Sequence, residues 1–168
     1  IRSIGSFDED AVPAVDTLVA ALSDPDVEVR VAAAMAFAQV GAGASKAAPA
    51  VSKHLKDEDV RVRESATLAL RAIGKGGAAA IPALIAALKD SAATVRMLAA
   101  LALGSMGPAA EPAVPAMQEA ILAVNGPDMS AENIQDVRYI CRALGDIGPG
   151  ARGAIPALRQ IQHLRIKY

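Results

Sequence analysis

The chain has 168 residues, of which 53% are hydrophobic but only 2% aromatic, and it contains no Trp. Its 17 basic and 18 acidic residues leave a formal net charge of −1, so the chain as a whole is not attracted to nucleic acid or to an anionic membrane surface. A single cysteine excludes an internal disulfide and a metal cluster held by several cysteines. No uninterrupted apolar run approaches the roughly 18 residues of a membrane span, so we expect no membrane insertion.

The first residues resemble the end of a structural unit. The tetrapeptide RSIG at residues 2–5 matches RAIG at residues 71–74. The chain also opens at Ile1 rather than at Met. We therefore expect residues 1–5 to complete a preceding repeat and the chain to be part of a longer protein. No signal peptide is present, which leaves the compartment open.

Short markers recur along the chain in a fixed order. Three of them return every 33 residues, and a proline follows each marker glycine by eight residues. The markers are Asp24, Asp57 and Asp90; Arg30, Arg63 and Arg96; and Gly41, Gly74 and Gly107. A last glycine and proline, Gly148 and Pro156, keep the same eight-residue step. Self-similarity at such a period is typical of an array of stacked structural repeats.

Each unit is predicted to contain two helices. The first begins at the proline, where the missing N–H costs nothing in the first helical turn, and stops before the aspartate. That aspartate can cap the second helix, as in the sequence Asp24-Pro25. The second helix runs to the glycine, which suits the left-handed backbone that ends many helices. No segment alternates like a strand, so the chain is predicted to be all-α.

The whole chain, 1–168, is expected to be one domain of about four such units. The first unit departs from the pattern, because its loop is longer and Asp16 stands where the other units have proline. The last two marker glycines are 41 residues apart instead of 33, with the additional residues around 123–130. The expected limits are about 11–46, 47–79, 80–112 and 113–153 for the repeats and 154–168 for a terminal helix.

The pattern V-R-x-x-A-A-x-A-L-x-x-I-G after an aspartate is carried, with small departures, by residues 57–74 and 90–107. It resembles HEAT repeats, in particular the short bacterial type found in phycobilin lyases and in many scaffold proteins. The resemblance covers nearly the whole chain and implies a right-handed α-solenoid, an α–α superhelix of about four helix pairs. It implies little about function, because members of the family share little beyond this fold.

One arginine in each unit is predicted to lie at the edge of the face formed by the second helices. We expect these arginines to pair with aspartates of the loops and so to form a structural ladder between repeats. A basic stripe that faces a ligand is the alternative. The expected ladder consists of Arg30, Arg63, Arg96, Arg138, Asp24, Asp57 and Asp90.

Stacked helix pairs leave a concave surface lined by their second helices. A spacing of about 100° per residue assigns to the core side of one second helix Val29, Ala33, Phe37 and Val40. The opposite side, transferred to later units, combines apolar residues with Arg and Glu, which is typical of protein-binding sites. The alternative is that Leu68 and Leu101 pack on the neighbouring repeat. The predicted partner-binding residues are Glu64, Thr67, Arg71, Met97, Leu101, Tyr139 and Arg142.

No catalytic constellation is predicted. The segment GPGARG at 148–153 matches the dinucleotide motif G-x-G-x-x-G literally, but a helix precedes it and that motif follows a strand. His54 and His163 lie far apart in the sequence, and neither has a nucleophile or carboxylate at a spacing that would make it a base. We therefore expect no cofactor and no metal site.

The enzymes among HEAT-repeat proteins differ from this sequence in specific ways. HEAT-type deoxyhypusine hydroxylases bind iron through His-Glu pairs, whereas His54 and His163 are each followed by Leu. HEAT-like DNA glycosylases need a basic groove lined with aromatic residues, which this composition lacks. Subunits of bilin lyases, or chaperones for chromophore attachment, remain an alternative. The sequence thus predicts a non-catalytic scaffold that binds an unidentified protein partner through its concave face; nucleic-acid binding is a distant third.

Overall fold

The computed structural model describes residues 12–123 and 131–165, and all regular structure in these two ranges is helical. The α-helices are α1 (Val12–Ala21), α2 (Val27–Val40), α3 (Ala48–Lys53), α4 (Val60–Ile73), α5 (Ile81–Ala87), α6 (Ala93–Ser105), α7 (Val114–Ala123), α8 (Ala131–Ile147) and α9 (Ile155–Arg165). Short 3₁₀ segments between them are η2 (Gly41–Ala47), η3 (His54–Lys56), η4 (Gly74–Ala80), η5 (Gly107–Ala113) and η6 (Gly148–Ala154). The all-α prediction is confirmed. The expected repeat end at residues 1–5, and all of the expected insertion around 123–130 except residue 123, lie outside the described residues.

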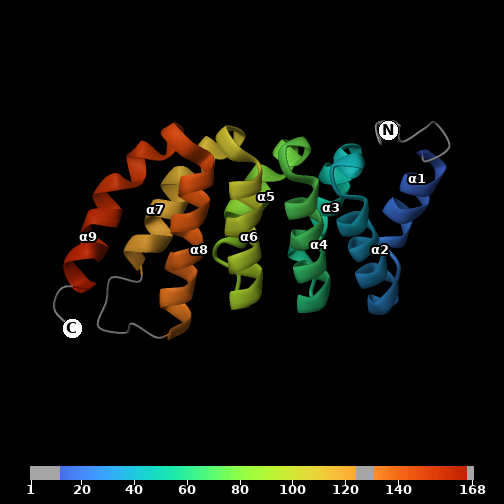
Figure 1. Ribbon diagram of the computed structural model, residues 1–168. Helices are drawn as coiled ribbons and strands as arrows, with labels where there is room; N and C mark the ends of the chain where they lie inside the picture. The colour runs from blue at the N-terminus through green and yellow to red at the C-terminus, as the bar shows by residue number, and fades with distance from the viewer. Residues whose placement is uncertain (1–11, 124–130, 166–168) are drawn as a thin grey trace.

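The helices form two rows, as Figure 1 shows. The even-numbered helices α2, α4, α6 and α8 stand side by side, and each packs closely on the next. The other row contains the odd-numbered helices, and α3 contacts α5 over only a few residues. Helix pairs follow one another in chain order from α1–α2 to α7–α8, and α9 comes last. This arrangement is the α-solenoid of helix pairs that the sequence predicts.

The marker glycines end the even-numbered helices. Gly41, Gly74 and Gly107 have φ of 61°, 62° and 62°, and Gly148 has φ of 81°. At Gly41 and Gly74 ψ is −132°, which lies outside the left-handed helical region and is open essentially to glycine alone. The N–H of Gly74 still donates to the carbonyl of Leu70, so the last turn of α4 is closed. A 3₁₀ segment then carries the chain across to the next odd-numbered helix.

The caps of α2 and α4 differ from the prediction by two residues. The N-cap of α2 is Asp26, whose carboxylate accepts from the N–H of Glu28, and the N-cap of α4 is Asp59. The marker Asp24 instead accepts from the N–H of Asp26 at 2.8 Å, within the preceding loop. The marker aspartates therefore order the loop, and the carboxylates of Asp57 and Asp90 also accept from an arginine of the preceding repeat.

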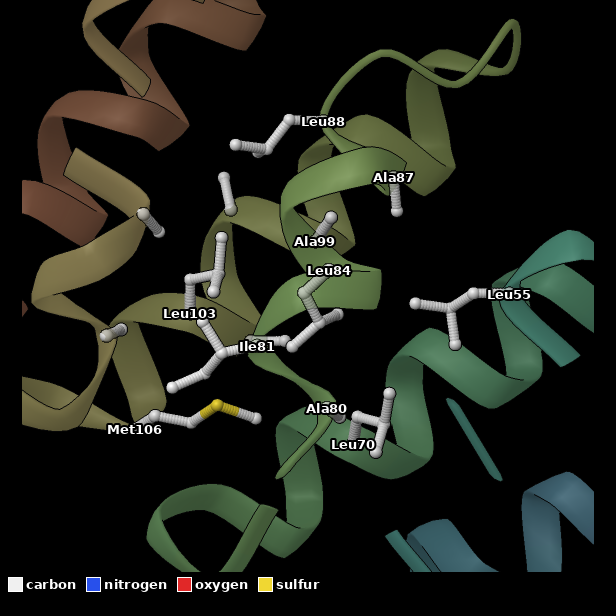
Figure 2. Close-up of a cluster of buried hydrophobic side chains, with 14 of the residues drawn as sticks. Leu55, Leu70, Ala80, Ile81, Leu84, Ala87, Leu88, Ala99, Leu103 and Met106 are labelled. Carbon is white, nitrogen blue, oxygen red and sulfur yellow. The ribbon is translucent and has the colours of Figure 1, made fainter. Parts of the chain in front are cut away.

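The core lies between the two rows and is made of small and medium apolar side chains. Leu70 of α4, Leu84 of α5 and Leu103 of α6 are fully buried and converge in Figure 2. Each such leucine contributes about 1.5–3 kcal/mol to folding through removal of its surface from water. Alanine is the commonest buried residue of the even-numbered helices, and small side chains at a helix contact permit a close interaxial distance.

The predicted core side of α2 is correct for Ala33 and Phe37 and wrong for Val29. Val29 is 38% exposed, whereas Ala34, which the same frame placed on the opposite side, is fully buried. Val62 and Val95 occupy the repeat position of Val29 and are both fully buried. They differ because each has a complete helix pair before it, whereas only α1 precedes α2 in the described part of the chain.

Two continuous helical stretches, Val27–Lys56 and Val60–Ala87, are long and apolar enough to cross a membrane by length and composition alone. Each contains two helices from different rows, because a glycine with positive φ interrupts it at Gly41 or Gly74. Core helices pass the same test of composition, so these stretches are weak evidence for a membrane span.

Candidate protein-binding face

Consecutive repeats are joined by an arginine that contacts both of them. The Nε and Nη2 of Arg30 on α2 donate to Oδ2 and Oδ1 of Asp57 at 2.9 and 3.1 Å. Its Nη1 donates to the backbone carbonyls of Asp24 and Pro25 at 2.9 and 3.1 Å. One guanidinium thus closes the loop of its own repeat and forms a two-point ion pair with the next. Two parallel hydrogen bonds from a planar guanidinium to one carboxylate form one of the stronger kinds of ion pair in proteins.

The same arrangement recurs in the next two repeats. Arg63 donates to both carboxylate oxygens of Asp90, at 2.9 and 3.1 Å. Arg96 donates from Nε to Oδ2 of Asp136 at 2.7 Å. The side chains of the first two pairs are only 10–14% exposed, so solvent screens them weakly. We call Arg30–Asp57, Arg63–Asp90 and Arg96–Asp136 the inter-repeat ladder.

The ladder shifts the protonation equilibria of its members. Burial alone would raise the pKa of Asp57, but the hydrogen bonds from Arg30 and from the N–H of Asp59 outweigh it and hold the pKa below its ordinary value of 3.8. Asp90 has a lowered pKa for the same reasons, with Arg63 as its partner. His54, whose Nδ1 lies 4.0 Å from Oδ2 of Asp57, has a pKa below 6.5 chiefly because of burial. All three groups are thus held in the form that they have at neutral pH.

The ladder differs from the predicted one in two ways. The carboxylate of Asp24 does not form a rung. Each arginine binds the carboxylate of the aspartate in the following repeat, but only the backbone carbonyl of the aspartate in its own repeat. Arg138 is exposed, and no ion pair joins it to another described residue. The ladder arginines stand 11 residues before their marker glycine, and Val137 has that place in the fourth unit. Arg138 thus stands one residue past the ladder register, and Ala131 has the place of the marker aspartate, so that Asp136 on α8 accepts from Arg96 instead.

The outward sides of α2, α4, α6 and α8 form a continuous mixed surface, which we call the inner face. Its central members are exposed or half-buried. They are Met35, Glu64, Leu68, Arg71, Met97, Leu101, Arg138 and Arg142. Met35 on α2 is 39% exposed. The predicted residues Glu64, Arg71, Met97, Leu101 and Arg142 are thus accessible, whereas Met35, Leu68 and Arg138 were not among the predicted set.

Two predicted members do not belong to the centre of the inner face. Thr67 is fully buried, and its Oγ1 donates to the carbonyl of Arg63 at 2.6 Å, so its prediction as a contact residue is wrong. Thr67 lies at the edge of the 100° frame, where α4 is covered by its neighbour. Tyr139 is half-buried against the core and stands at the repeat position of Leu98, at the margin of the face.

Two open recesses lie in the C-terminal half of the array. One, of about 390 Å³, is lined by Gln135, Arg138, Tyr139 and Arg142 on α8. The other, of about 350 Å³, has an apolar floor that includes Leu88 and Ile140 and is bordered by two ion pairs, Lys89–Glu119 and Arg96–Asp136. Sequence reasoning did not find the second recess, because its walls come from α6, α7, α8 and the residues that follow α5.

Family models for HEAT repeats match three overlapping segments of the chain. "HEAT repeats" matches residues 1–71, "PBS lyase HEAT-like repeat" matches 62–90, and "HEAT repeat" matches 80–110. Together they cover residues 1–110 without a gap. The chain is a HEAT-repeat protein. The resemblance drawn from the sequence is confirmed, and no curated protein sequence matches the chain significantly.

Solved structures share this HEAT-repeat architecture. The complex of CpcE and CpcF of phycocyanin lyase from Nostoc sp. PCC7120 contains a chain that is 26% identical, with a TM-score of 0.70 over 95% of this chain and 62% of that one. An engineered protein is 26% identical, with a TM-score of 0.64 over 86% of this chain and 66% of its own. A designed armadillo repeat protein in complex with the peptide (KR)4 is 20% identical at a TM-score of 0.64, over 89% of this chain and 74% of its own, and shows the fold alone. The chain therefore spans slightly less than two thirds of the first two structures.

The surroundings of the cysteine, the histidine and the acidic residues can be described for most of the HEAT repeats. Within 12–123 and 131–165, no three His, Cys, Asp or Glu side chains lie together as a metal site would require. Cys141 is a free, partly buried thiol, and burial raises its pKa, which reduces its reactivity as a thiolate. The side chain of His54 is 16% exposed and lies beside Asp57 of the ladder. These groups have a structural explanation without any substrate.

Proposed function

We propose that this HEAT-repeat chain is a non-catalytic interaction scaffold that holds a protein partner on its inner face. The observation that carries the proposal is the composition of that face. Met35, Leu68 and Leu101 offer apolar area on three successive helices, and Arg71 and Arg142 stand beside them. Apolar side chains bordered by Arg are the usual composition of a protein interface.

Rigidity of the array supports the same function. The inter-repeat ladder fixes each helix pair to the next through two hydrogen bonds in two of its three rungs. A surface that is ordered before binding loses little conformational entropy when the partner arrives. The closer packing of the even-numbered row also favours a curve toward the inner face, because the more tightly packed row of a curved stack lies on its inner side.

A subunit of a bilin lyase, or a chaperone for chromophore attachment, is the second candidate. It rests on the structural likeness to the CpcE–CpcF complex of phycocyanin lyase, at 26% identity and a TM-score of 0.70. The two candidates differ in a simple optical measurement. A scaffold leaves the absorption spectrum of an added bilin unchanged, whereas a chromophore-binding subunit shifts it.

Affinity capture with matched variants tests the proposal. The first bait is the unchanged chain, and the second is an inner-face variant with Met35→Asp, Arg71→Glu and Arg142→Glu. The control variant carries Lys53→Glu, Ala86→Asp and Arg159→Glu, which are exposed on the other row and change the net charge equally. Circular dichroism checks that all three baits are folded.

The proposal predicts a partner that the unchanged chain and the control variant retain and the inner-face variant loses. Equal retention by both variants would contradict it and would move the site away from the inner face. A bilin shift that the inner-face variant abolishes would replace the scaffold with the chromophore-binding alternative.

A further inference from the structure

We propose that the partner segment held by the inner face is acidic and apolar: its carboxylates pair with Arg138 and Arg142, and its apolar side chains lie on Leu101 and Leu68. This inference rests on the proposed scaffold function and specifies the chemistry of the partner. Three independent features of the described residues carry it.

The first feature is a pair of arginines without internal partners. Arg138 and Arg142 are exposed and stand four residues apart on α8, so their guanidinium groups project from the same side of the helix. No ion pair joins either of them to another described residue. Both line the recess of about 390 Å³, together with Gln135 and Tyr139. The site thus has unused cationic donors around an open space.

The second feature is the contrast with the other arginines of the even-numbered helices. Those at the ladder are paired with aspartates, and Arg61 contacts both Glu28 and Asp59. Only Arg71 resembles the pair on α8, since it is exposed and has no ion pair to a described residue. Among the described arginines of the even-numbered helices, two of the three without an ion pair therefore lie on α8, where they can bind a carboxylate of a partner.

Two acidic residues, Asp146 and Glu64, form no ion pair with Arg138 or Arg142. Asp146 follows Arg142 by four residues, but its Oδ2 lies toward the backbone of Gly104, 3.2 Å from the place of a Cβ there. Glu64 is half-buried on α4, two even-numbered helices away from Arg138. The C-terminal end of the inner face therefore keeps two unneutralised cations.

The third feature is the alignment of these arginines with the apolar residues. Six residues before each marker glycine stand, in order, Met35, Leu68, Leu101 and Arg142. Ten residues before it, Met97 precedes Arg138 in the same way. A partner that crosses the even-numbered row meets apolar side chains on the earlier helices and a guanidinium on α8.

The alignment also predicts a spacing within the partner. Packed helices lie about 8–10 Å apart, and an extended chain advances about 3.3 Å per residue, so successive helices are separated by about three residues of an extended partner. An acidic residue should therefore stand about three residues from an apolar one. A nucleic acid fits this face less well, because an apolar row would lie against its phosphates.

Selection from a library of random peptides tests the proposal. The peptides are about 12 residues long, enough to cross four helices at about three residues each. The library is selected on the unchanged chain after depletion on the inner-face variant, and the retained sequences are compared with the starting pool. We expect enrichment of Asp or Glu about three residues from Leu, Ile, Met or Phe.

Charge reversal at α8 then tests the assignment to these two arginines. The double variant Arg138→Glu and Arg142→Glu should bind the selected peptides at least about tenfold more weakly, as measured by fluorescence anisotropy. Arg159→Glu, an exposed arginine of α9, should leave the affinity unchanged and serves as the control.

The outcomes separate this proposal from the scaffold function. Enrichment of basic or uncharged apolar peptides on the inner face would overturn the acidic assignment and leave the scaffold function intact. Equal binding of acidic peptides by the unchanged chain and the double variant would overturn the role of Arg138 and Arg142. No enrichment over the inner-face variant, with a shifted absorption spectrum of added bilin, would contradict the scaffold function itself.

Discussion

Arg30 donates to both carboxylate oxygens of Asp57, which belongs to the following repeat and stands 27 residues later in the chain. The same guanidinium holds two carbonyls of its own loop. A single side chain therefore couples the loop conformation of one repeat to the position of the next. Because Arg63 and Asp90 repeat the contact, the coupling continues along the array.

Removal of one ladder aspartate should destabilise the chain strongly. Asp57→Ala leaves the guanidinium of Arg30, whose side chain is 10% exposed, without its counter-ion. We expect the free energy of unfolding to fall by about 2–4 kcal/mol, the range for breaking a largely buried charge pair. Urea denaturation followed by circular dichroism measures the change.

The control for Asp57→Ala is Glu28→Ala. It removes a carboxylate from Arg61 in an exposed pair, so the expected loss is below about 1 kcal/mol. Equal losses in the two variants would show that the ladder contributes no more than a surface ion pair.

Acid should weaken the ladder. The pKa of Asp57 and of Asp90 is lower in the folded chain than the ordinary 3.8, so the folded state holds these protons less tightly than the unfolded state does. Their stabilising contribution is complete above pH 3.8 and is lost as the pH falls below 3.8 toward the folded value. Urea midpoints between pH 5 and 2.5 should fall less steeply for Asp57→Asn than for the unchanged chain.

His54 should add a separate dependence near neutrality. Its pKa is lowered from 6.5, chiefly by burial, so the folded chain prefers the neutral imidazole. As the pH falls below 6.5, the unfolded chain gains a proton that the folded chain resists, and stability declines. His54→Gln should remove this part of the decline between pH 7.5 and 5.5. An unchanged slope in that variant would show that His54 titrates alike in both states.

Two glycines at the same repeat position should respond oppositely to alanine. A Cβ at Gly104 would lie 3.0 Å from the Cα of Ala143, because α6 and α8 approach closely there. At Gly145 on α8 nothing lies within 4 Å. Gly145→Ala should raise the free energy of unfolding by about 0.5–1 kcal/mol, since glycine is a poor residue inside a helix.

Gly104→Ala should lower the free energy of unfolding, because the backbones of α6 and α8 would have to separate. Thermal and urea unfolding of both variants provide the measurement. If Gly104→Ala and Gly145→Ala raised the free energy of unfolding equally, the separation of α6 and α8 would have no cost in free energy, and the prediction would be contradicted.

Much of the fold follows from sequence spacing alone. The 33-residue interval between Gly41 and Gly74 sets the length of one repeat, and both glycines have the positive φ that ends a helix. The marker arginine and aspartate were correctly singled out as a structural pair. Which aspartate each arginine contacts could not be read from the markers, because that depends on which loop lies beside which helix.

The errors in the predicted binding residues arise because a spacing of 100° per residue does not show where a neighbouring helix covers the surface. Thr67 and Arg71 are close on a helical wheel, but Thr67 is fully buried and Arg71 is exposed. Arg138 was aligned by residue type, although counting back from Gly148 places Val137 in the ladder register. Counting from the glycine would have assigned Arg138 to the inner face from sequence alone.

The central claim is that a protein partner lies on the inner face, and site-specific crosslinking tests it most directly. A photoreactive phenylalanine analogue replaces Leu101 on α6 in one variant and Ala86, exposed on α5, in another. Both are expressed in cells of the source organism, illuminated, and examined for crosslinked products by mass spectrometry. The account predicts a protein adduct at Leu101 and none at Ala86. An adduct at Ala86 alone, or no adduct at either position, would contradict it.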